Sequence, residues 1–316
     1  MQVVVAHRAS GIIYRLVRQY PGCYILPANV CPIVPLTIIL AGSDVKFVDI
    51  SKDTWCLDEK ETVGILKDNL SYRGVFFVHT YGCNYNPQSF FSSLKSISNE
   101  IIIVDDKCLC VPSVEGPSTV ADMTLFSTGY AKYVDFGHGG FCFLKDGISL
   151  SQEYVDYSGF DIEALYKDCF KNRRKLQDVP NGWLDAEVSN EYGSGYFKDI
   201  KSAKCIIAQK KNCINSIYDV AFASFDRLGN DYNNWRYNIL VKNKDIVLSN
   251  IFASGLFASS HYQPSSELFC DTIFSNSKWL YEHIINLFND KYITEAQAIK
   301  MVGVLTSTNC SKSIIL

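Results

Sequence analysis

Short apolar runs alternate with helix-like segments over the first 145 residues, and this alternation constrains the fold more than any other feature. Several runs are apolar at every position, as expected for strands that helices cover on both faces. The pattern therefore predicts an α/β domain with a mostly parallel central sheet covered by helices. The expected strands are Val3–His7, Cys23–Pro27, Val45–Ile50, Gly74–Thr80, Ile101–Asp106, Met123–Ser127 and Gly140–Leu144, and the expected helices are Ser10–Gln19, Asp58–Asn69 and Pro87–Ser96.

The chain changes character after these segments. Gly140–Leu144 follows its predecessor too closely for an intervening helix, so we expect this strand to run antiparallel. From Phe197 onward apolar residues recur at helical spacing, which predicts a long helix. We expect that helix to lead into a smaller α+β domain in which Tyr237–Val241 is a strand.

The end of the chain carries one clear helix signal. Thr294 and Gln297 have the spacing of a capping box, in which each side chain bonds the backbone N–H of the other residue. We expect the last helix to begin there. The predicted division is a large α/β domain over residues 1–205 and a small C-terminal domain over residues 206–316.

Composition excludes several classes of partner. A net charge of −3 gives no reason to expect nucleic acid or an anionic membrane surface. No apolar run approaches the twenty or so residues of a membrane span, and the start lacks the basic region and cleavage site of a signal peptide. The twelve cysteines form no Cys-x-x-Cys pair, so we expect reduced, mostly buried thiols in a cytoplasmic protein.

Three features along the large domain have chemical potential. The turn after the first strand carries Ser10 as a candidate N-cap, and the start of the following helix can bind an anion. Asp106 ends a buried strand at the carboxyl edge of the sheet, where ligands of open α/β folds bind. Lys132 follows a strand that ends in Ser127 and precedes a glycine pair. Together they match the three anchors of pyridoxal phosphate (PLP), which has a phosphate, a ring nitrogen and an aldehyde.

Other functional interpretations of the polar residues have less support in the sequence. His79 and the cysteines that follow it at 83, 108 and 110 lack standard zinc spacing, so we expect core thiols and a hydrogen-bonded histidine, and no metal site. Ser127 has no Gly-x-Ser-x-Gly sequence around it, which argues against a hydrolase nucleophile. No dinucleotide-binding or Walker A glycine pattern is present.

In these motifs the chain resembles the DegT/StrS family of PLP-dependent sugar aminotransferases, which have fold type I. The resemblance runs over nearly the whole chain. It rests on Leu26-Pro27-Ala28, Phe47-Val48-Asp49-Ile50, Val78-His79-Thr80-Tyr81-Gly82, Val104-Asp105-Asp106, Phe126-Ser127, Lys132, Gly139-Gly140 and His261-Tyr262-Gln263-Pro264.

The resemblance implies a role for each candidate residue. Lys132 holds the cofactor aldehyde and moves the proton, and Asp106 pairs with the ring nitrogen. The phosphate is held by Ala9, Ser10 and Ser127, and Cys31 stands where many family members place an aromatic residue on the ring.

The resemblance also implies the substrates. An amino acid, L-glutamate by analogy, donates an amino group to a nucleotide-linked keto-sugar, and the enzyme works as a homodimer in surface-polysaccharide or amino-sugar synthesis. The alternative is a catalytically impaired member that serves as a binding or partner subunit. Leu109, Cys31 and Arg8 favour that alternative because each departs from the family pattern at the cofactor site.

Overall fold

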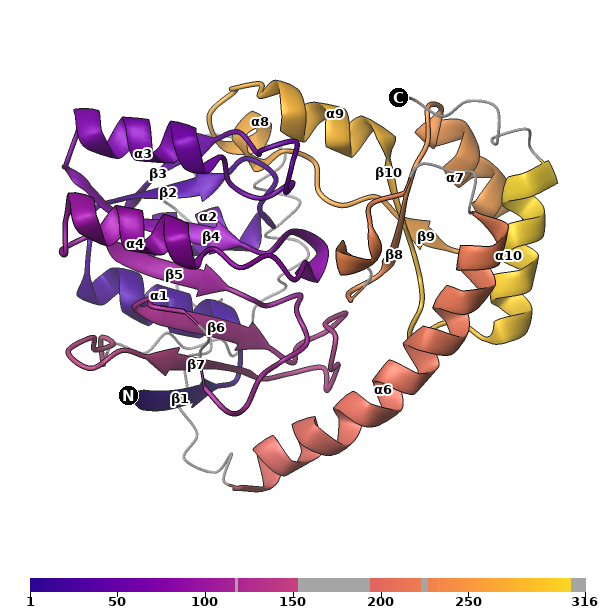
Figure 1. The fold of residues 1–316 in the computed structure, drawn as a ribbon, viewed down its shortest axis with the longest axis horizontal. Helices are drawn as coiled ribbons and strands as arrows, with labels where there is room; N and C mark the ends of the chain where they lie inside the picture. Colours follow the sequence, from indigo (N-terminus) through magenta and orange to yellow (C-terminus); the bar gives the residue numbers. More distant parts are fainter. Residues whose placement is uncertain (117–118, 153–193, 223–226, 233, 308–316) are drawn as a thin grey trace.

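The computed structural model describes residues 1–116, 119–152, 194–222, 227–232 and 234–307. A seven-stranded sheet and a three-stranded sheet lie at opposite sides of the molecule (Figure 1). The strands are β1 (Gln2–Ala6), β2 (Cys23–Pro27), β3 (Asp44–Val48), β4 (Tyr72–Val78), β5 (Ile102–Asp106), β6 (Met123–Ser127), β7 (Gly140–Leu144), β8 (Tyr237–Leu240), β9 (Ala258–Ser259) and β10 (Ile284–Leu287).

Helices connect and cover these strands. The α-helices are α1 (Ala9–Gln19), α2 (Ile33–Leu40), α3 (Glu59–Asp68), α4 (Gln88–Ile97), α6 (Ser194–Ala221), α7 (Lys244–Ala253), α8 (Ser265–Phe269), α9 (Ser275–His283) and α10 (Glu295–Ser307). Two short 3₁₀ turns, η1 (Thr80–Gly82) and η4 (Asn230–Tyr232), complete the described part.

The large sheet has the strand order β1-β7-β6-β5-β4-β2-β3. Strands β2 to β6 are parallel to one another, whereas β7 pairs antiparallel with both β6 and β1. The antiparallel strand predicted from the close spacing before Gly140 is therefore confirmed. This topology brings the carboxyl ends of β4, β5 and β6 to the same edge of the sheet.

Both faces of the large sheet are buried, because successive side chains of a strand point to opposite faces. On β4, Phe76 joins the core formed with α1 and α2, whereas Val75 and Phe77 join the core formed with α3 and α4. Each such aromatic or branched side chain contributes about 1.5–3 kcal/mol when fully buried. Burial on both faces explains why these strands are apolar at nearly every position.

Helix α6 connects the two sheets (Figure 1). Near its start Ile200 packs with Phe126 and Phe141 of the large sheet. Two turns from its end, Ile214 and Tyr218 belong to the core of the small sheet. The helix thus runs across the predicted domain boundary at 205/206, and the division into two domains stays a prediction.

Two local expectations need correction. Helix α2 was not predicted, because it is apolar at nearly every position and therefore has no helical periodicity to detect. Ser10 is not an N-cap: α1 begins at Ala9 with Arg8 as its N-cap, and Arg8 makes no side-chain cap bond. Arg8 has an extended backbone and pairs with Gly139 in an isolated bridge, and the helix begins at the next residue, Ala9.

The capping box before α10 is confirmed. The backbone N–H of Thr294 donates to Oε1 of Gln297 at 2.9 Å, and the N–H of Gln297 donates back to Oγ1 of Thr294 at 3.2 Å. Within the described residues, no helix is both long and apolar enough to cross a membrane.

Candidate functional site

One cavity of about 200 Å³ lies at the carboxyl edge of the large sheet. It contains side chains from α1, from the segment after β2, from β5, from β6 and from the turn after β6. All six residues that the sequence singled out line it, namely Ala9, Ser10, Cys31, Asp106, Ser127 and Lys132. The fold therefore gathers residues that are spread over more than 120 positions of the chain.

The start of α1 forms one end of this cavity. Ala9 and Ser10 are the first two residues of the helix, and their N–H groups belong to the four that have no partner within a helix. Ser127 ends the neighbouring strand β6. This end of the cavity therefore offers hydroxyl and N–H donors, with the positive end of the helix dipole behind them.

The glycine pair makes this close approach possible. A Cβ on Gly140 would lie 2.4 Å from the backbone nitrogen of Ala9, and one on Gly139 would lie 2.3 Å from Oγ1 of Thr128. Gly139 also has a φ of +95°, which side-chain-bearing residues rarely adopt. Only glycine lets β7 pass so close to the start of α1.

Asp106 presents a buried carboxylate to the cavity. It is 4% exposed, and its Oδ1 accepts a hydrogen bond from the backbone N–H of Cys108 at 3.0 Å. Burial raises its pKa, while hydrogen bonds from Cys108 and the charges of Lys132 and His79 oppose that effect. A cationic group entering the cavity would favour the ionised form of Asp106.

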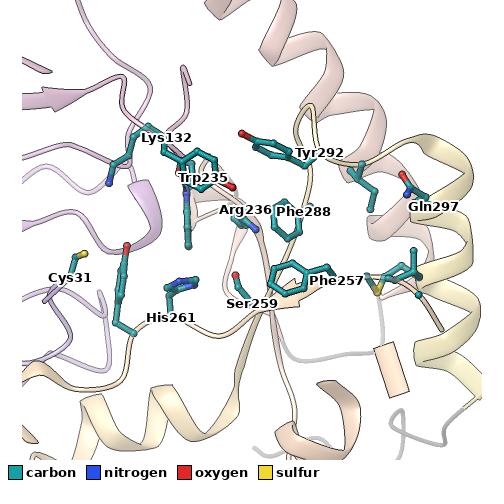
Figure 2. A pocket seen from close by; sticks show the side chains of 17 residues that line it. Cys31, Lys132, Trp235, Arg236, Phe257, Ser259, His261, Phe288, Tyr292 and Gln297 are labelled. Atoms are coloured by element: carbon teal, nitrogen blue, oxygen red, sulfur yellow. Dashed lines mark hydrogen bonds between the residues drawn. The ribbon is translucent and has the colours of Figure 1, made fainter. Parts of the chain in front are cut away.

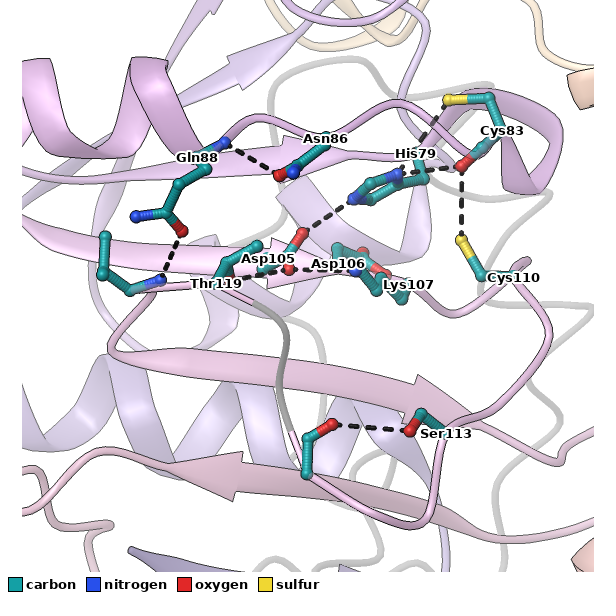
Figure 3. Close-up of polar contacts among 12 residues, drawn as sticks. His79, Cys83, Asn86, Gln88, Asp105, Asp106, Lys107, Cys110, Ser113 and Thr119 are labelled. Atoms are coloured by element: carbon teal, nitrogen blue, oxygen red, sulfur yellow. Dashed lines mark hydrogen bonds and ion pairs between the residues drawn. The ribbon is translucent and has the colours of Figure 1, made fainter.

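The adjacent Asp105 points the other way, into a polar network (Figure 3). Its Oδ1 lies 2.8 Å from Nε2 of His79, and its Oδ2 accepts from the Thr119 hydroxyl at 3.1 Å. Nδ1 of His79 lies 3.0 Å from the carbonyl oxygen of Cys83. Burial disfavours the His79 imidazolium, but the hydrogen bonds to Asp105 and Cys83 outweigh burial and raise the pKa to about 9. His79 is thus a fully hydrogen-bonded core histidine, as expected.

The turn that carries Lys132 is held in an unusual conformation. Ala131 has a φ of +56°, a left-handed conformation that costs about 1 kcal/mol or more for a residue with a side chain. The Asp135 carboxylate accepts from the Ala131 N–H at 3.0 Å, and the Trp235 indole donates to the Ala131 carbonyl at 2.6 Å. A residue from the C-terminal part thereby positions the lysine-bearing turn.

The remaining wall of the cavity is largely apolar. Burial raises the pKa of the Cys31 thiol, and the positive charge of Lys132 opposes that effect. Leu109 also lines the cavity, at 7% exposure. Two positions that the family resemblance leads one to expect as aromatic and polar are therefore a thiol and an alkyl group.

A second cavity of about 700 Å³ adjoins the first (Figure 2). The two share Cys31, Tyr130, Lys132 and Tyr262. Lys132 and Cys31 lie at its large-sheet side, whereas Phe257 and Phe288 approach from the small sheet. A molecule in the larger cavity can therefore reach the lysine.

The sequence analysis assigned no role to the polar residues of this second cavity. Arg236 and His261 line it beside Trp235. The available signal was a single arginine between Trp235 and Tyr237 at the start of a predicted strand, where a cation is out of place unless it has a partner or a ligand.

Comparisons with known proteins address the fold. No family model and no curated protein matches the sequence. A DegT/DnrJ/EryC1/StrS aminotransferase from Brucella abortus is 16% identical with a TM-score of 0.68, over 98% of this chain and 86% of that one. DesI, solved in the presence of its TDP-sugar product, is 16% identical with a TM-score of 0.72, over 98% of this chain and 81% of that one.

A third similar structure was solved with its cofactor in the PLP form. A proposed sugar aminotransferase from Streptococcus pneumoniae in its PLP form is 16% identical with a TM-score of 0.70, over 99% of this chain and 88% of that one. At these identities the likeness establishes the fold. The chain has the fold-type-I architecture of PLP-dependent aminotransferases, with a large, mostly parallel sheet and a smaller C-terminal α+β part.

Proposed function

We propose that this chain is a divergent DegT/StrS-type enzyme that binds PLP and moves an amino group from an amino acid to a nucleotide-linked keto-sugar. The observation that supports it best is the convergence of six residues, chosen from the sequence alone, on one cavity. The fold likeness adds to this, since similar structures were solved in a PLP form and with a TDP-sugar product.

The residues present fit the cofactor. Ala9, Ser10 and Ser127 would hold the phosphate at the start of α1, where N–H and hydroxyl donors meet the helix dipole. Asp106 would pair with the ring nitrogen, and its raised pKa in the free protein fits a carboxylate that awaits a cationic partner. Lys132 would hold the aldehyde carbon. When bound, PLP supplies an electron sink that allows an amino group to be exchanged between two carbon skeletons.

The chain's own groups would carry the proton. Lys132 borders both cavities, so its amine can reach a substrate that enters from the larger one. Its turn is fixed by Asp135 and Trp235, which limits the positions that the amine can take. L-Glutamate as amino donor, a homodimer, a cytoplasmic location and a role in surface-polysaccharide synthesis belong to the same proposal.

A non-catalytic binding subunit is the second candidate. Leu109 supports it, because an alkyl side chain in the cavity cannot hydrogen-bond a cofactor. The intact set of Lys132, Asp106 and Ser127 opposes it, since nothing in a purely structural role requires these three groups to face one cavity.

The test is an absorbance titration of the purified protein with PLP, followed by borohydride reduction and peptide mapping. We expect a visible band and a reduced cofactor fixed on Lys132. L-Glutamate should then convert the bound cofactor to its amino form, which a nucleotide-linked keto-sugar should reverse. A folded protein with no band and no labelled lysine would refute the enzyme and leave the binding subunit.

A further inference from the structure

The larger cavity contains a buried arginine, two of whose nitrogens have no hydrogen-bond partner among the described residues. Arg236 is 3% exposed, and among the described residues none accepts a hydrogen bond from its Nε or Nη1 atoms. Leaving a buried charge unpaired is costly, and buried charges are usually paired. Burial lowers the pKa of Arg236, and the carboxylate of Asp290 opposes that effect without an observed hydrogen bond to the guanidinium.

Two further polar atoms in the same cavity also lack a partner within the described part of the chain. They are Oγ of Ser259 and Nδ1 of His261, and both residues line the cavity beside Arg236 (Figure 2). Burial, with the charge of Arg236, lowers the pKa of His261 to about 4, so the ring is neutral near pH 7. A neutral imidazole can place a donor at Nδ1.

Aromatic packing sets the orientation of the guanidinium. Its central carbon lies 3.4 Å from the centre of the Phe288 ring and 4.9 Å from that of the Trp235 ring. An arginine stacked on aromatic faces keeps its N–H groups at its edge, free for hydrogen bonds. That edge matches the paired oxygens of a carboxylate or phosphate.

A buried amide pair holds this arrangement in place from behind. Asn238 and Asn286 face each other in the β8–β10 ladder, and Nδ2 of Asn286 donates to Oδ1 of Asn238 at 2.7 Å. Asn238 also donates to the carbonyl of Arg236 at 3.0 Å, and Oδ1 of Asn286 accepts from the backbone N–H of His261 at 2.8 Å. The backbones that carry both cavity residues are therefore held before any ligand arrives.

We propose that Arg236, with Ser259 and His261, forms a preorganised site for an oxyanion of the substrate, a carboxylate or a phosphate, in the cavity next to Lys132. This proposal rests on the proposed function, in which the reaction takes place at Lys132. It makes Arg236 a residue that determines which substrate binds. The two sources of the oxyanion are the carboxylates of the amino donor and the phosphates of the nucleotide-linked sugar.

The test measures binding of two probes to the PLP-loaded protein by calorimetry and by quenching of tryptophan fluorescence. Glutarate represents the carboxylate source because it has no amine to react, and dTDP represents the phosphate source. We expect one of the two probes to bind the wild-type protein. The same probe should bind Arg236→Met at least about tenfold more weakly, because the substitution removes a hydrogen bond from a charged group. Arg236→Lys should recover only part of the affinity, because an ammonium cannot form the two-pronged contact.

Stability separates a binding role from a structural one. An unpaired buried guanidinium opposes folding, so Arg236→Met should unfold at the same or a higher urea concentration than the wild type. Arg227→Met, which removes an arginine paired with Asp219 on the same side of the molecule, is the control and should leave probe binding unchanged. If Arg236→Met does not fold, Ser259→Ala takes its place, with an expected loss of about threefold or more.

The outcomes are distinct. Binding of neither probe, or equal binding by wild type and Arg236→Met, overturns the inference. A lower unfolding midpoint for Arg236→Met with unchanged binding also overturns it in favour of a structural role. The cofactor band is read in the same samples and does not depend on Arg236, so its absence would count against the proposed function and not against the oxyanion site.

Discussion

The two adjoining cavities differ in how their polar groups are treated. In the smaller one the carboxylate of Asp106 has a backbone partner and Lys132 sits on a tightly held turn. In the larger one Arg236, Ser259 and His261 have polar atoms that no described residue satisfies. This difference fits our two proposals, in which a resident cofactor completes the first cavity and a group of the substrate completes the second.

The same contrast recurs between two adjacent residues. Asp105 and Asp106 follow each other on β5, so their side chains point to opposite faces of the sheet. Asp105 is tied to His79 and Thr119 in the core, whereas Asp106 faces the cavity. Identical side chains one position apart thus serve stability in one case and, in our proposal, chemistry in the other.

Loss of Lys132 should have the largest effect. Lys132→Ala should abolish covalent retention of PLP and all transfer activity while leaving the fold intact, because the Lys132 side chain lines the cavity and does not belong to the hydrophobic core. The measurements are the visible absorbance band, the borohydride-fixed label and far-UV circular dichroism. Lys46→Ala removes an exposed lysine on β3 and should behave as the wild type. A retained label in Lys132→Ala would contradict the assignment.

The paired aspartates provide the next test. Asp105→Asn should lower the free energy of unfolding by about 3 kcal/mol, because it removes the charge that a buried His79 depends on. Asp106→Asn should change it by less than about 1 kcal/mol, because an amide oxygen can still accept from Cys108. Urea unfolding measures both, and PLP titration should show the opposite order of effects. Equal losses of stability would remove the distinction between the two residues.

A substitution at Gly140 tests whether this glycine is needed because the backbone of α1 lies so close, and not only because glycine is flexible. Gly140→Ala should destabilise by about 2 kcal/mol and weaken PLP binding, since the new methyl group meets the backbone nitrogen of Ala9. Gly64→Ala is the matched control: Gly64 lies within α3 and has open space around it. That substitution should stabilise by about 0.5–1 kcal/mol. A tolerated Gly140→Ala would show that β7 can move away from α1.

The smallest expected effect is a pH dependence. The pKa of His79 rises from 6.5 to about 9 on folding, so its ion pair with Asp105 is fully present below pH 6.5 and is lost as pH rises towards 9. The difference in unfolding free energy between wild type and Asp105→Asn should therefore narrow across that window. Urea unfolding at pH 6, 7.5 and 9 measures it, and a difference that widens with pH would contradict the charged pair.

Local residue patterns predicted most of the large sheet and its helices. Strands such as Cys23–Pro27 and Met123–Ser127 were delimited to the residue, because fully buried strands and their turns leave an unbroken apolar signature. The same property hid α2, since a helix buried all round has no polar face to reveal its period. The start of α1 was predicted one residue late, because the N-cap Arg8 makes no side-chain cap bond that a sequence pattern could reveal.

The sequence by itself predicted the fold class from its apolar runs, and it predicted the six residues of the first cavity from the chemistry of short segments and their resemblance to a known family. Only the tertiary structure revealed that those residues share one cavity, that Trp235 holds the turn before Lys132, and that Arg236 is buried beside a ring more than fifty residues away. The physical reason is that unpaired charge and cavity shape are properties of contacts between distant segments, which no local pattern records.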